Sequence, residues 1–145
     1  MIYVGYQGIG KSTICQNIDK CVDLESSNFY VDGERNENWH KIYVSIAEHL
    51  SNQGKIVFVS SHKAVREEMA KLGIPFKVIY PSLELKGEWI KKLSDRYHLD
   101  MTEKNYKALK FAVVNYDESI SDLSNEENKI VIDDINYELE KLIEL

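Results

Sequence analysis

The first thirteen residues carry the feature that most constrains this chain. An apolar run over residues 1–4 is typical of a buried strand. It is followed by the spacing of a phosphate loop, which is Gly, four residues, Gly, Lys, and Ser or Thr. The matching residues are Gly5, Gly10, Lys11 and Ser12. A helical stretch comes next, with Ile14, Ile18 and Val22 at intervals of four. Strand, glycine loop and helix form the context that this motif requires.

The residue types in the loop suit a bound phosphate group. Glycines permit positive φ angles and a close approach of backbone N–H groups, and the loop leads into a helix N-terminus, which favours an anion. Lys11 can place its charge near the terminal phosphates of ATP or another nucleoside triphosphate, and the Ser12 hydroxyl can ligate Mg²⁺. The expected cofactor-binding residues are Gly8, Ile9, Gly10, Lys11, Ser12 and Thr13.

Length and charge limit the classes of protein to which this chain can belong. A chain of 145 residues predicts one domain over 1–145, and a net charge of −6 argues against general binding of duplex nucleic acid. No apolar run approaches the length of about 18 residues that spans a membrane, and no signal peptide is recognisable, so the expected compartment is the cytoplasm. Cys15 and Cys21 have neither a metal nor a redox spacing, and two cysteines make no disulfide framework.

Apolar runs and helical periodicities alternate along the chain. Strands are predicted over residues 1–4, 22–27, 55–60, 76–80 and 129–132. A polar loop with a turn at 32–33 is predicted over residues 28–37. Helices are predicted over 38–52, over 62–72 with a cap at Ser61, from Ser82 through Tyr97, from a Thr102 cap to about 124, and after Asp133 or Asp134. Helical spacing places the following apolar residues on the inward faces: Trp39, Ile42, Tyr43, Ile46, Leu50, Val65, Met69, Leu72, Leu85, Trp89, Leu93, Tyr97, Tyr106, Leu109, Val113, Tyr116, Ile120, Leu123, Ile135, Leu139 and Leu142. This alternation favours an α/β fold, with a five-stranded parallel sheet covered by helices on both faces. Ligands of such sheets bind beyond the carboxyl ends of the strands.

Polar side chains follow several of the predicted strands. Asp23 and Glu25 end the second strand and are the candidates for catalysis and for orienting an acceptor. Ser60, His62 and Arg66 follow the third strand and are the candidates for substrate binding. For His62 and Arg66 the alternative is a polar helix start or a surface ion pair. The third strand ends without a carboxylate, which points away from a motor ATPase or a GTPase.

A second group of candidates lies near residues 94–104, where a break between two helices predicts a short lid. Arg96 lies just before the break and could close over the phosphates, although a surface ion pair is the alternative. Residues 86–110 are rich in lysine and arginine. This segment could face phosphates or form a solvated helix face.

The layout resembles the small phosphate-loop kinases of the gluconate, shikimate and nucleoside monophosphate kinase group. The loop over 5–13 resembles theirs most closely, including the extra Gly8 and the trailing Thr13. Asp23 and Glu25 resemble the acidic pair of these kinases. The stretch 59–66 resembles their third strand and the helix that follows it, and Arg96 resembles the arginine of their lid. The chain also looks like the compact kinases of bacteriophages. The resemblance implies a three-layer phosphate-loop NTPase fold with strand order 2-3-1-4-5, and ATP and Mg²⁺ as cofactors.

The expected function is an ATP-dependent phosphotransferase that moves the γ-phosphate to a small acceptor, a nucleoside or nucleotide before a sugar acid. The expected catalytic residues are Lys11, Asp23, Glu25 and Arg96. Three alternatives remain at this point: a kinase acting on a modified base or an end within DNA, an NTP hydrolase, and a non-catalytic nucleotide-binding module. The expected partners are a nucleotide and a small acceptor, with DNA as an alternative acceptor, and the expected state is a monomer or homodimer.

Overall fold

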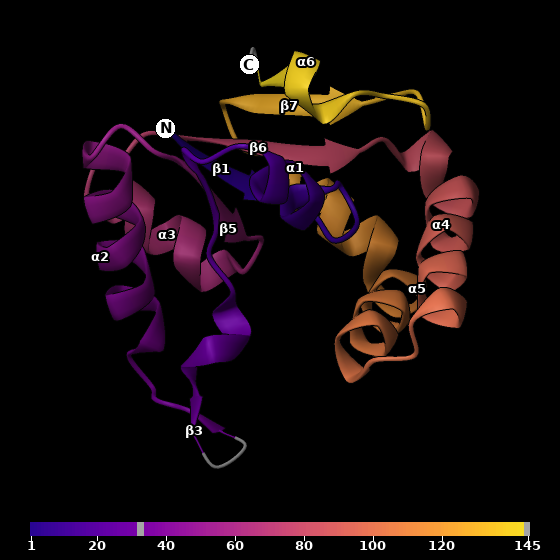
Figure 1. Cartoon of the computed structure of the whole chain (residues 1–145), viewed down its shortest axis with the longest axis horizontal. Coiled ribbons are helices and arrows are strands. Elements are labelled where there is room, and N and C mark those ends of the chain that lie inside the picture. The colour runs from indigo at the N-terminus through magenta and orange to yellow at the C-terminus, as the bar shows by residue number, and fades with distance from the viewer. Residues whose placement is uncertain (32–33, 144–145) are drawn as a thin grey trace. The chain divides into compact units, whose positions relative to one another are not determined.

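A computed structural model describes residues 1–31 and 34–143 and has α/β architecture (Figure 1). Five strands form a parallel sheet in the order β2-β5-β1-β6-β7. These strands are β1 (Ile2–Gly5), β2 (Cys21–Asp23), β5 (Ile56–Ser60), β6 (Phe76–Pro81) and β7 (Lys129–Ile132). They correspond to the five predicted strands in the order 2-3-1-4-5, so this part of the expected fold is confirmed.

The chain forms two compact units, the first made of residues 1–5 and 10–78. Its helices are α1 (Lys11–Asn17), α2 (Trp39–Asn52) and α3 (Lys63–Lys71). The helices α2 and α3 lie side by side (Figure 1), and α2 also contacts β5. The apolar run in β5 is buried, as expected for a strand in the middle of a parallel sheet. The core of this unit includes Ile2, Val4, Ile14, Val44, Val57, Val59, Val65 and Met69.

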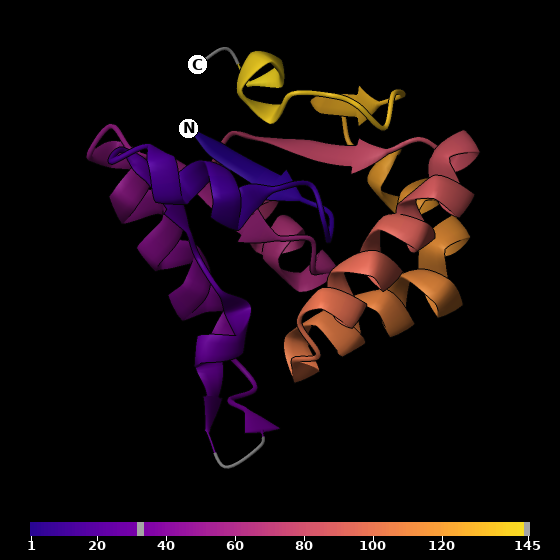
Figure 2. The ribbon, with the colours of Figure 1, turned by 45° about the vertical axis from the view of Figure 1, so that its right-hand side comes forward.

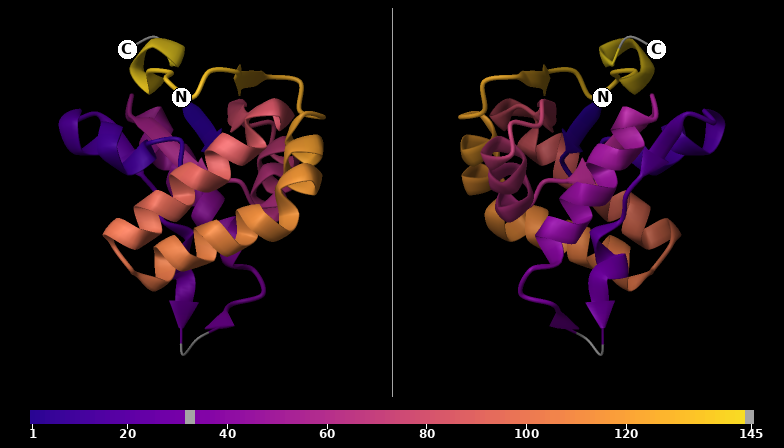
Figure 3. Two further views of the ribbon diagram at one scale, coloured as in Figure 1. Left: turned by 90° about the vertical axis from the view of Figure 1, so that its right-hand side faces the viewer. Right: turned by 90° about the vertical axis from the view of Figure 1, so that its left-hand side faces the viewer.

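Two segments of the first unit differ from the sequence-based prediction. The first helix ends at Asn17, and Val22 belongs to β2 rather than to the helix. The second strand ends at Asp23 instead of Ser27, and a 3₁₀ turn, η1 (Ser26–Phe29), follows it. Two short strands, β3 (Tyr30–Val31) and β4 (Glu34–Arg35), then pair antiparallel where a polar loop was expected (Figure 3). The predicted turn at 32–33 lies outside the described residues.

The second unit consists of residues 6–9 and the described residues from 79 onward. The 3₁₀ turn η2 (Leu83–Leu85) leads into α4 (Lys86–Leu99), and α5 (Glu103–Leu123) returns beside it as an antiparallel neighbour (Figure 2). Trp89 and Leu93 of α4 and Tyr116 of α5 are buried as predicted. Thr102 caps α5 by accepting a hydrogen bond from the backbone N–H of Asn105 at 3.1 Å, which confirms the predicted cap.

The end of the chain is less helical than predicted. After β7, the only helix among the described residues is the one-turn α6 (Leu139–Leu142). The Asp134 carboxylate accepts the backbone N–H of Asn136 and so forms a local turn, not the cap of a longer helix. The reason is that a Ser, Asn or Asp side chain that bonds its neighbouring backbone competes with helix formation.

Several helix faces are rotated from their predicted positions. In α2 the buried side chains are Tyr43, Val44 and Ala47, whereas Ile42 is 57% exposed. Leu72, expected to point inward, lies at the end of α3 and is 55% exposed. Spacing defines a stripe on a helix, but contacts with neighbouring elements decide which edge of a broad stripe is buried.

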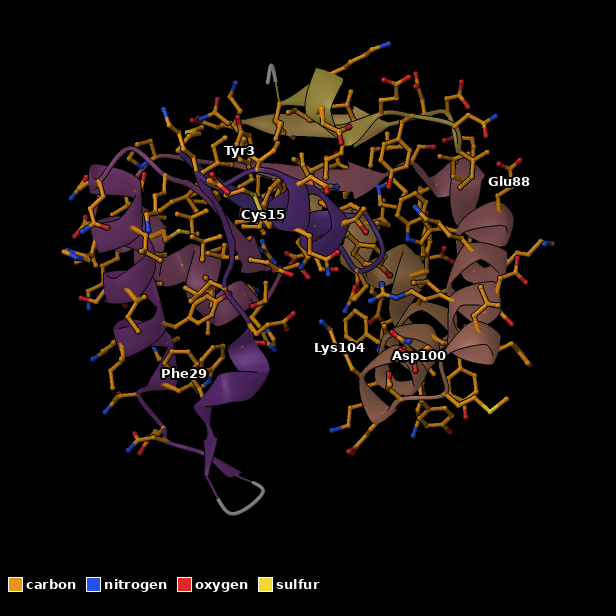
Figure 4. All side chains as sticks on the ribbon, in the orientation of Figure 1. Tyr3, Cys15, Phe29, Glu88, Asp100 and Lys104 are labelled. Carbon is orange, nitrogen blue, oxygen red and sulfur yellow. A yellow bond between two sulfur atoms is a disulfide. The ribbon has the colours of Figure 1, made fainter. Side chains whose placement is uncertain are left out.

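Cys15 and Cys21 are joined by a disulfide between α1 and the start of β2 (Cys15 is labelled in Figure 4). Their spacing did not predict this pairing. The chain reverses direction over residues 18–20, where the backbone N–H of Cys21 bonds the carbonyl of Ile18. The reversal brings the two Cα atoms to 4.7 Å, within the range that a disulfide requires.

Candidate phosphate-binding site

The loop between β1 and α1 has the backbone conformation that its glycines predict. Gly8 has φ +86° and Gly10 has φ +102°, both in the left-handed region that side chains disfavour. In the first unit, the ammonium of Lys11 reaches back across the loop and donates to the carbonyl of Gly5 at 3.4 Å. The lysine therefore extends from the start of α1 back to the end of β1, and its positive charge lies at the first residue of the loop.

The ends of three strands of the first unit lie next to one another. In the parallel registers, Gly5 pairs with Ser60 and Asp23 pairs with Phe58. The backbone continues this pairing one residue further, because the N–H of Leu24 donates to the carbonyl of Phe58 at 2.9 Å. The structure thus brings Gly5, Ser60 and Asp23 to one edge of the sheet, where the sequence placed the candidate site. Glu25 lies beyond the end of β2, so strand alternation does not define its direction.

Tyr43 of α2 holds two of these strand ends together, and sequence analysis assigned it only to a helix face. Its hydroxyl donates to the carbonyl of Leu24 at 2.6 Å and accepts the backbone N–H of Ser60 at 2.9 Å. The pKa of Tyr43 is raised to about 12, mainly by burial and to a smaller extent by the charges of Asp23 and Glu25, while the hydrogen bond with Ser60 acts in the opposite direction. The hydroxyl therefore stays protonated at neutral pH and keeps both hydrogen bonds.

We expect Tyr43→Phe to lower the free energy of unfolding by about 1–3 kcal/mol, because it leaves two backbone groups without a partner. Denaturant titration measures this loss. Tyr106→Phe is the control, since that side chain is 48% exposed on α5. Equal stability of Tyr43→Phe and the wild type would show that the hydroxyl does not join the strand ends.

Ser60 and His62, predicted to bind substrate, are brought together. The Ser60 Oγ and the His62 Nδ1 are 2.7 Å apart, and the His62 ring lies edge-on to the ring of Trp39 with centroids 5.2 Å apart. Trp39 in turn lies 6.2 Å from the ring of Phe29 (labelled in Figure 4). The exposed imidazole is thus oriented by a hydroxyl on one side and by an aromatic group on the other.

Arg66, the third predicted substrate residue, is 5% exposed. Its Nε donates to the carbonyl of Ser61 at 3.3 Å, so the guanidinium supports the turn between β5 and α3. Ser61, predicted to cap α3, does not do so: His62 is the N-terminal flanking residue and makes no side-chain cap. Burial of a guanidinium against a backbone carbonyl satisfies part of its donor capacity.

Residues 6–9, the middle of the loop between β1 and α1, belong to the second unit, where two aromatic side chains hold the loop carbonyls. The indole Nε1 of Trp89 donates to the carbonyl of Gln7 at 2.8 Å, and the Tyr137 hydroxyl donates to the carbonyl of Ile9 at 2.7 Å. Sequence analysis treated Trp89 as a core residue and did not single out Tyr137. Periodicity cannot reveal contacts that join a loop near residue 8 to side chains so far along the chain.

We expect Gly8→Ala to destabilise the fold. A Cβ at this position would lie 2.8 Å from the Cδ2 of Leu93 and would have to adopt φ +86°. Gly54→Ala is the matched control, because Gly54 has φ +82° and no atom within 4 Å of an added Cβ. Thermal unfolding of both variants separates backbone strain, about 1–2 kcal/mol in each, from the clash at Gly8. Equal losses of stability in Gly8→Ala and Gly54→Ala would show that the Leu93 side chain moves aside without destabilising the fold.

Arg96 lies within α4 of the second unit, one helical turn from Lys92, and the break before α5 begins at Asp100. Burial and the nearby charge of Arg96 lower the pKa of Lys92 to about 8. A hollow of about 900 Å³ runs along α4 and the start of α5, and its cationic lining comprises Lys91, Lys92, Arg96 and Lys104. Figure 4 labels Glu88 near one end of α4, and Asp100 and Lys104 at the turn. The basic segment therefore borders a concave surface that Glu88, Asp95 and Asp100 also line.

The part of the chain that the structure describes, residues 1–31 and 34–143, can be compared with the requirements of a metal site in its side chains and of a membrane span in its helices. It holds no cluster of three or more His, Cys, Asp or Glu side chains suited to a metal ion. None of its helices combines the length and the apolar character that crossing a membrane requires. Comparison of the chain with protein-family models, with curated proteins and with solved structures finds no match.

Proposed function

We propose that the chain is a phosphate-loop kinase that transfers the γ-phosphate of ATP to a small acceptor. The observation that carries this proposal is the loop between β1 and α1. Two glycines in it have left-handed φ angles, and Lys11 reaches from its end to the carbonyl of Gly5 at 3.4 Å. These features suit a ring of backbone N–H groups closed by an ammonium group, which is how proteins bind the phosphates of a nucleotide.

The donor set also fits the cofactors. Bound ATP supplies the phosphoryl group, and Ser12 at the start of α1 would hold Mg²⁺ together with phosphate oxygens. Lys11 and the loop N–H groups would stabilise the β- and γ-phosphates. Asp23 would orient or deprotonate the acceptor with help from Glu25, and Arg96 would neutralise the charge that develops during transfer. Ser60, His62 and Arg66 would line the acceptor side.

A nucleoside or nucleotide is the acceptor that the surroundings of Ser60 favour. The rings of Phe29, Trp39 and His62 form an aromatic group in the first unit, and the His62 ring is exposed beside Ser60. Aromatic rings bind nucleobases by stacking, whereas a sugar acid offers no such surface. The Ser60–His62 pair adds hydrogen-bonding groups next to these rings.

The test is transfer of radiolabelled γ-phosphate from ATP and GTP to nucleosides, nucleoside monophosphates, small alcohols and DNA. Label that moves to a nucleoside or nucleotide supports the proposal and identifies the acceptor. Label on DNA alone would assign the kinase to bases or ends within DNA. Release of free phosphate alone would indicate a hydrolase, and tight ATP binding without turnover would indicate a binding module.

A further inference from the structure

We propose that Trp89, Lys92 and Tyr137 form a brace that positions the phosphate loop by holding the carbonyls of Gln7 and Ile9 on the side away from the ligand. The inference rests on the proposed function and adds positioning residues that no motif identifies. All of these residues, including residues 7–9 of the loop, belong to the second unit.

Hydrogen bonds to the carbonyls of Gln7 and Ile9 orient the peptide planes of the loop. In a trans peptide, the carbonyl of one residue and the N–H of the next point in opposite directions. No described peptide bond is cis. When Trp89 holds the carbonyl of Gln7 at 2.8 Å, the N–H of Gly8 must therefore point away from Trp89. When Tyr137 holds the carbonyl of Ile9 at 2.7 Å, the N–H of Gly10 must point away from Tyr137.

Both of these N–H groups are available to a ligand. Within the described residues, neither the Gly8 nor the Gly10 N–H donates a hydrogen bond to the protein. Backbone N–H groups that lack a partner and are turned to one side form an anion-binding concavity. The brace thus preorganises the donors before the phosphate arrives, which reduces the entropic cost of binding.

The contact with Lys92 determines the direction of the Tyr137 hydroxyl proton. The Lys92 ammonium lies 2.9 Å from the Tyr137 hydroxyl oxygen and has only donors. The oxygen must therefore accept from Lys92, which leaves the hydroxyl proton directed to the carbonyl of Ile9. Lys92 also lies 4.3 Å from the centroid of the Trp89 ring and 4.8 Å from that of Tyr137. Its cation–π contacts tie both aromatic groups to one charge.

Ring stacking and burial make the brace rigid. The rings of Trp89 and Tyr137 are stacked, with centroids 5.9 Å apart and planes inclined by 19°. Trp89 is fully buried, and Leu93 of the next turn would meet a Cβ at Gly8. The loop therefore contacts a packed surface on its carbonyl side, and it cannot rotate its peptide planes without losing these hydrogen bonds.

The test is calorimetric titration of the full chain with inorganic triphosphate and Mg²⁺, a probe that carries no base or sugar. We expect Tyr137→Phe, which keeps the ring and removes the hydroxyl, to bind about three- to tenfold more weakly. Lys92→Met keeps the aliphatic stem and is expected to weaken binding in the same direction. Tyr106→Phe is the matched control, and Lys11→Ala defines the binding that depends on the loop.

Backbone ¹⁵N order parameters separate positioning from a general loss of stability. In Tyr137→Phe, we expect lower order parameters for the Gly8 and Gly10 amides, whereas those of α5 stay unchanged. Unchanged affinity and unchanged loop order in both brace variants would overturn the inference and leave the proposed function standing. Wild-type binding that is absent, or that survives Lys11→Ala, would overturn the proposed function and the inference together.

Discussion

Lys11→Ala is expected to abolish detectable γ-phosphate transfer, with a loss in kcat/KM of at least about 10²- to 10³-fold. The ammonium lies 3.4 Å from the carbonyl of Gly5 at the start of the loop, and the proposed function assigns it to the terminal phosphates of the nucleotide. An alanine there removes the only side-chain charge of the loop 5–13. Transfer of radiolabelled phosphate to the acceptor found with the wild type measures the effect.

Lys20→Ala is the control for this experiment, because Lys20 is an exposed lysine of the same unit, located just before β2. Its variant should transfer phosphate at the wild-type rate. Thermal unfolding should show that both variants remain folded. If Lys11→Ala kept most of its activity, the loop would not be the phosphate site, and the proposed kinase function would be wrong.

Asp23→Asn is expected to lower kcat by about 10²- to 10⁴-fold while leaving the KM for ATP nearly unchanged. Asparagine has almost the same shape as aspartate, but it cannot take up a proton from the molecule that receives the phosphate. It also lacks the negative charge of the aspartate side chain. Asp23 pairs with Phe58 at the sheet edge, two residues before Ser60, and its charge acts on the buried Tyr43 hydroxyl. Steady-state kinetics with the acceptor saturating separates kcat from KM.

Asp19→Asn is the matched control, since Asp19 is an exposed carboxylate a few residues before Asp23 in the same unit. Glu25→Gln should have a smaller effect, because the proposal gives Glu25 an assisting role and its position lies beyond the end of β2. Normal transfer by Asp23→Asn would remove this residue from the catalytic set. If Asp23→Asn instead raised KM and left kcat unchanged, Asp23 would be a binding residue and not a catalytic one.

The parts of the fold that follow from local patterns were predicted well. The apolar runs of β1, β5, β6 and β7 appear as strands close to their predicted bounds. The runs of β1 and β5 are buried, as expected in a covered parallel sheet, whereas Val131 of β7 is 42% exposed. The Thr102 cap was also predicted, since it needs only one hydroxyl and the N–H three residues later. The sheet order that the kinase resemblance implied is the order in the structure.

The errors occurred where a local pattern was compatible with more than one outcome. The acidic stretch after β2 alternates like a strand, yet it forms a 3₁₀ turn once β2 has ended at Asp23. In α2, the spacing of Ile42 and Ile46 matched a buried stripe, but the buried edge is that of Tyr43, Val44 and Ala47. The disulfide between Cys15 and Cys21 depends on a chain reversal that cysteine spacing does not encode.

The loop of the candidate site could be recognised from sequence because its chemistry is local: glycine conformations, one ammonium group and one hydroxyl lie within a few residues. The residues that hold the site in place could not be recognised. The Tyr137 hydroxyl and the carbonyl of Ile9 are separated by 128 positions, and Tyr43 joins the backbones of residues 24 and 60. Such contacts arise only when folding buries distant polar groups together, and each buried donor or acceptor must then find a partner wherever the chain places one.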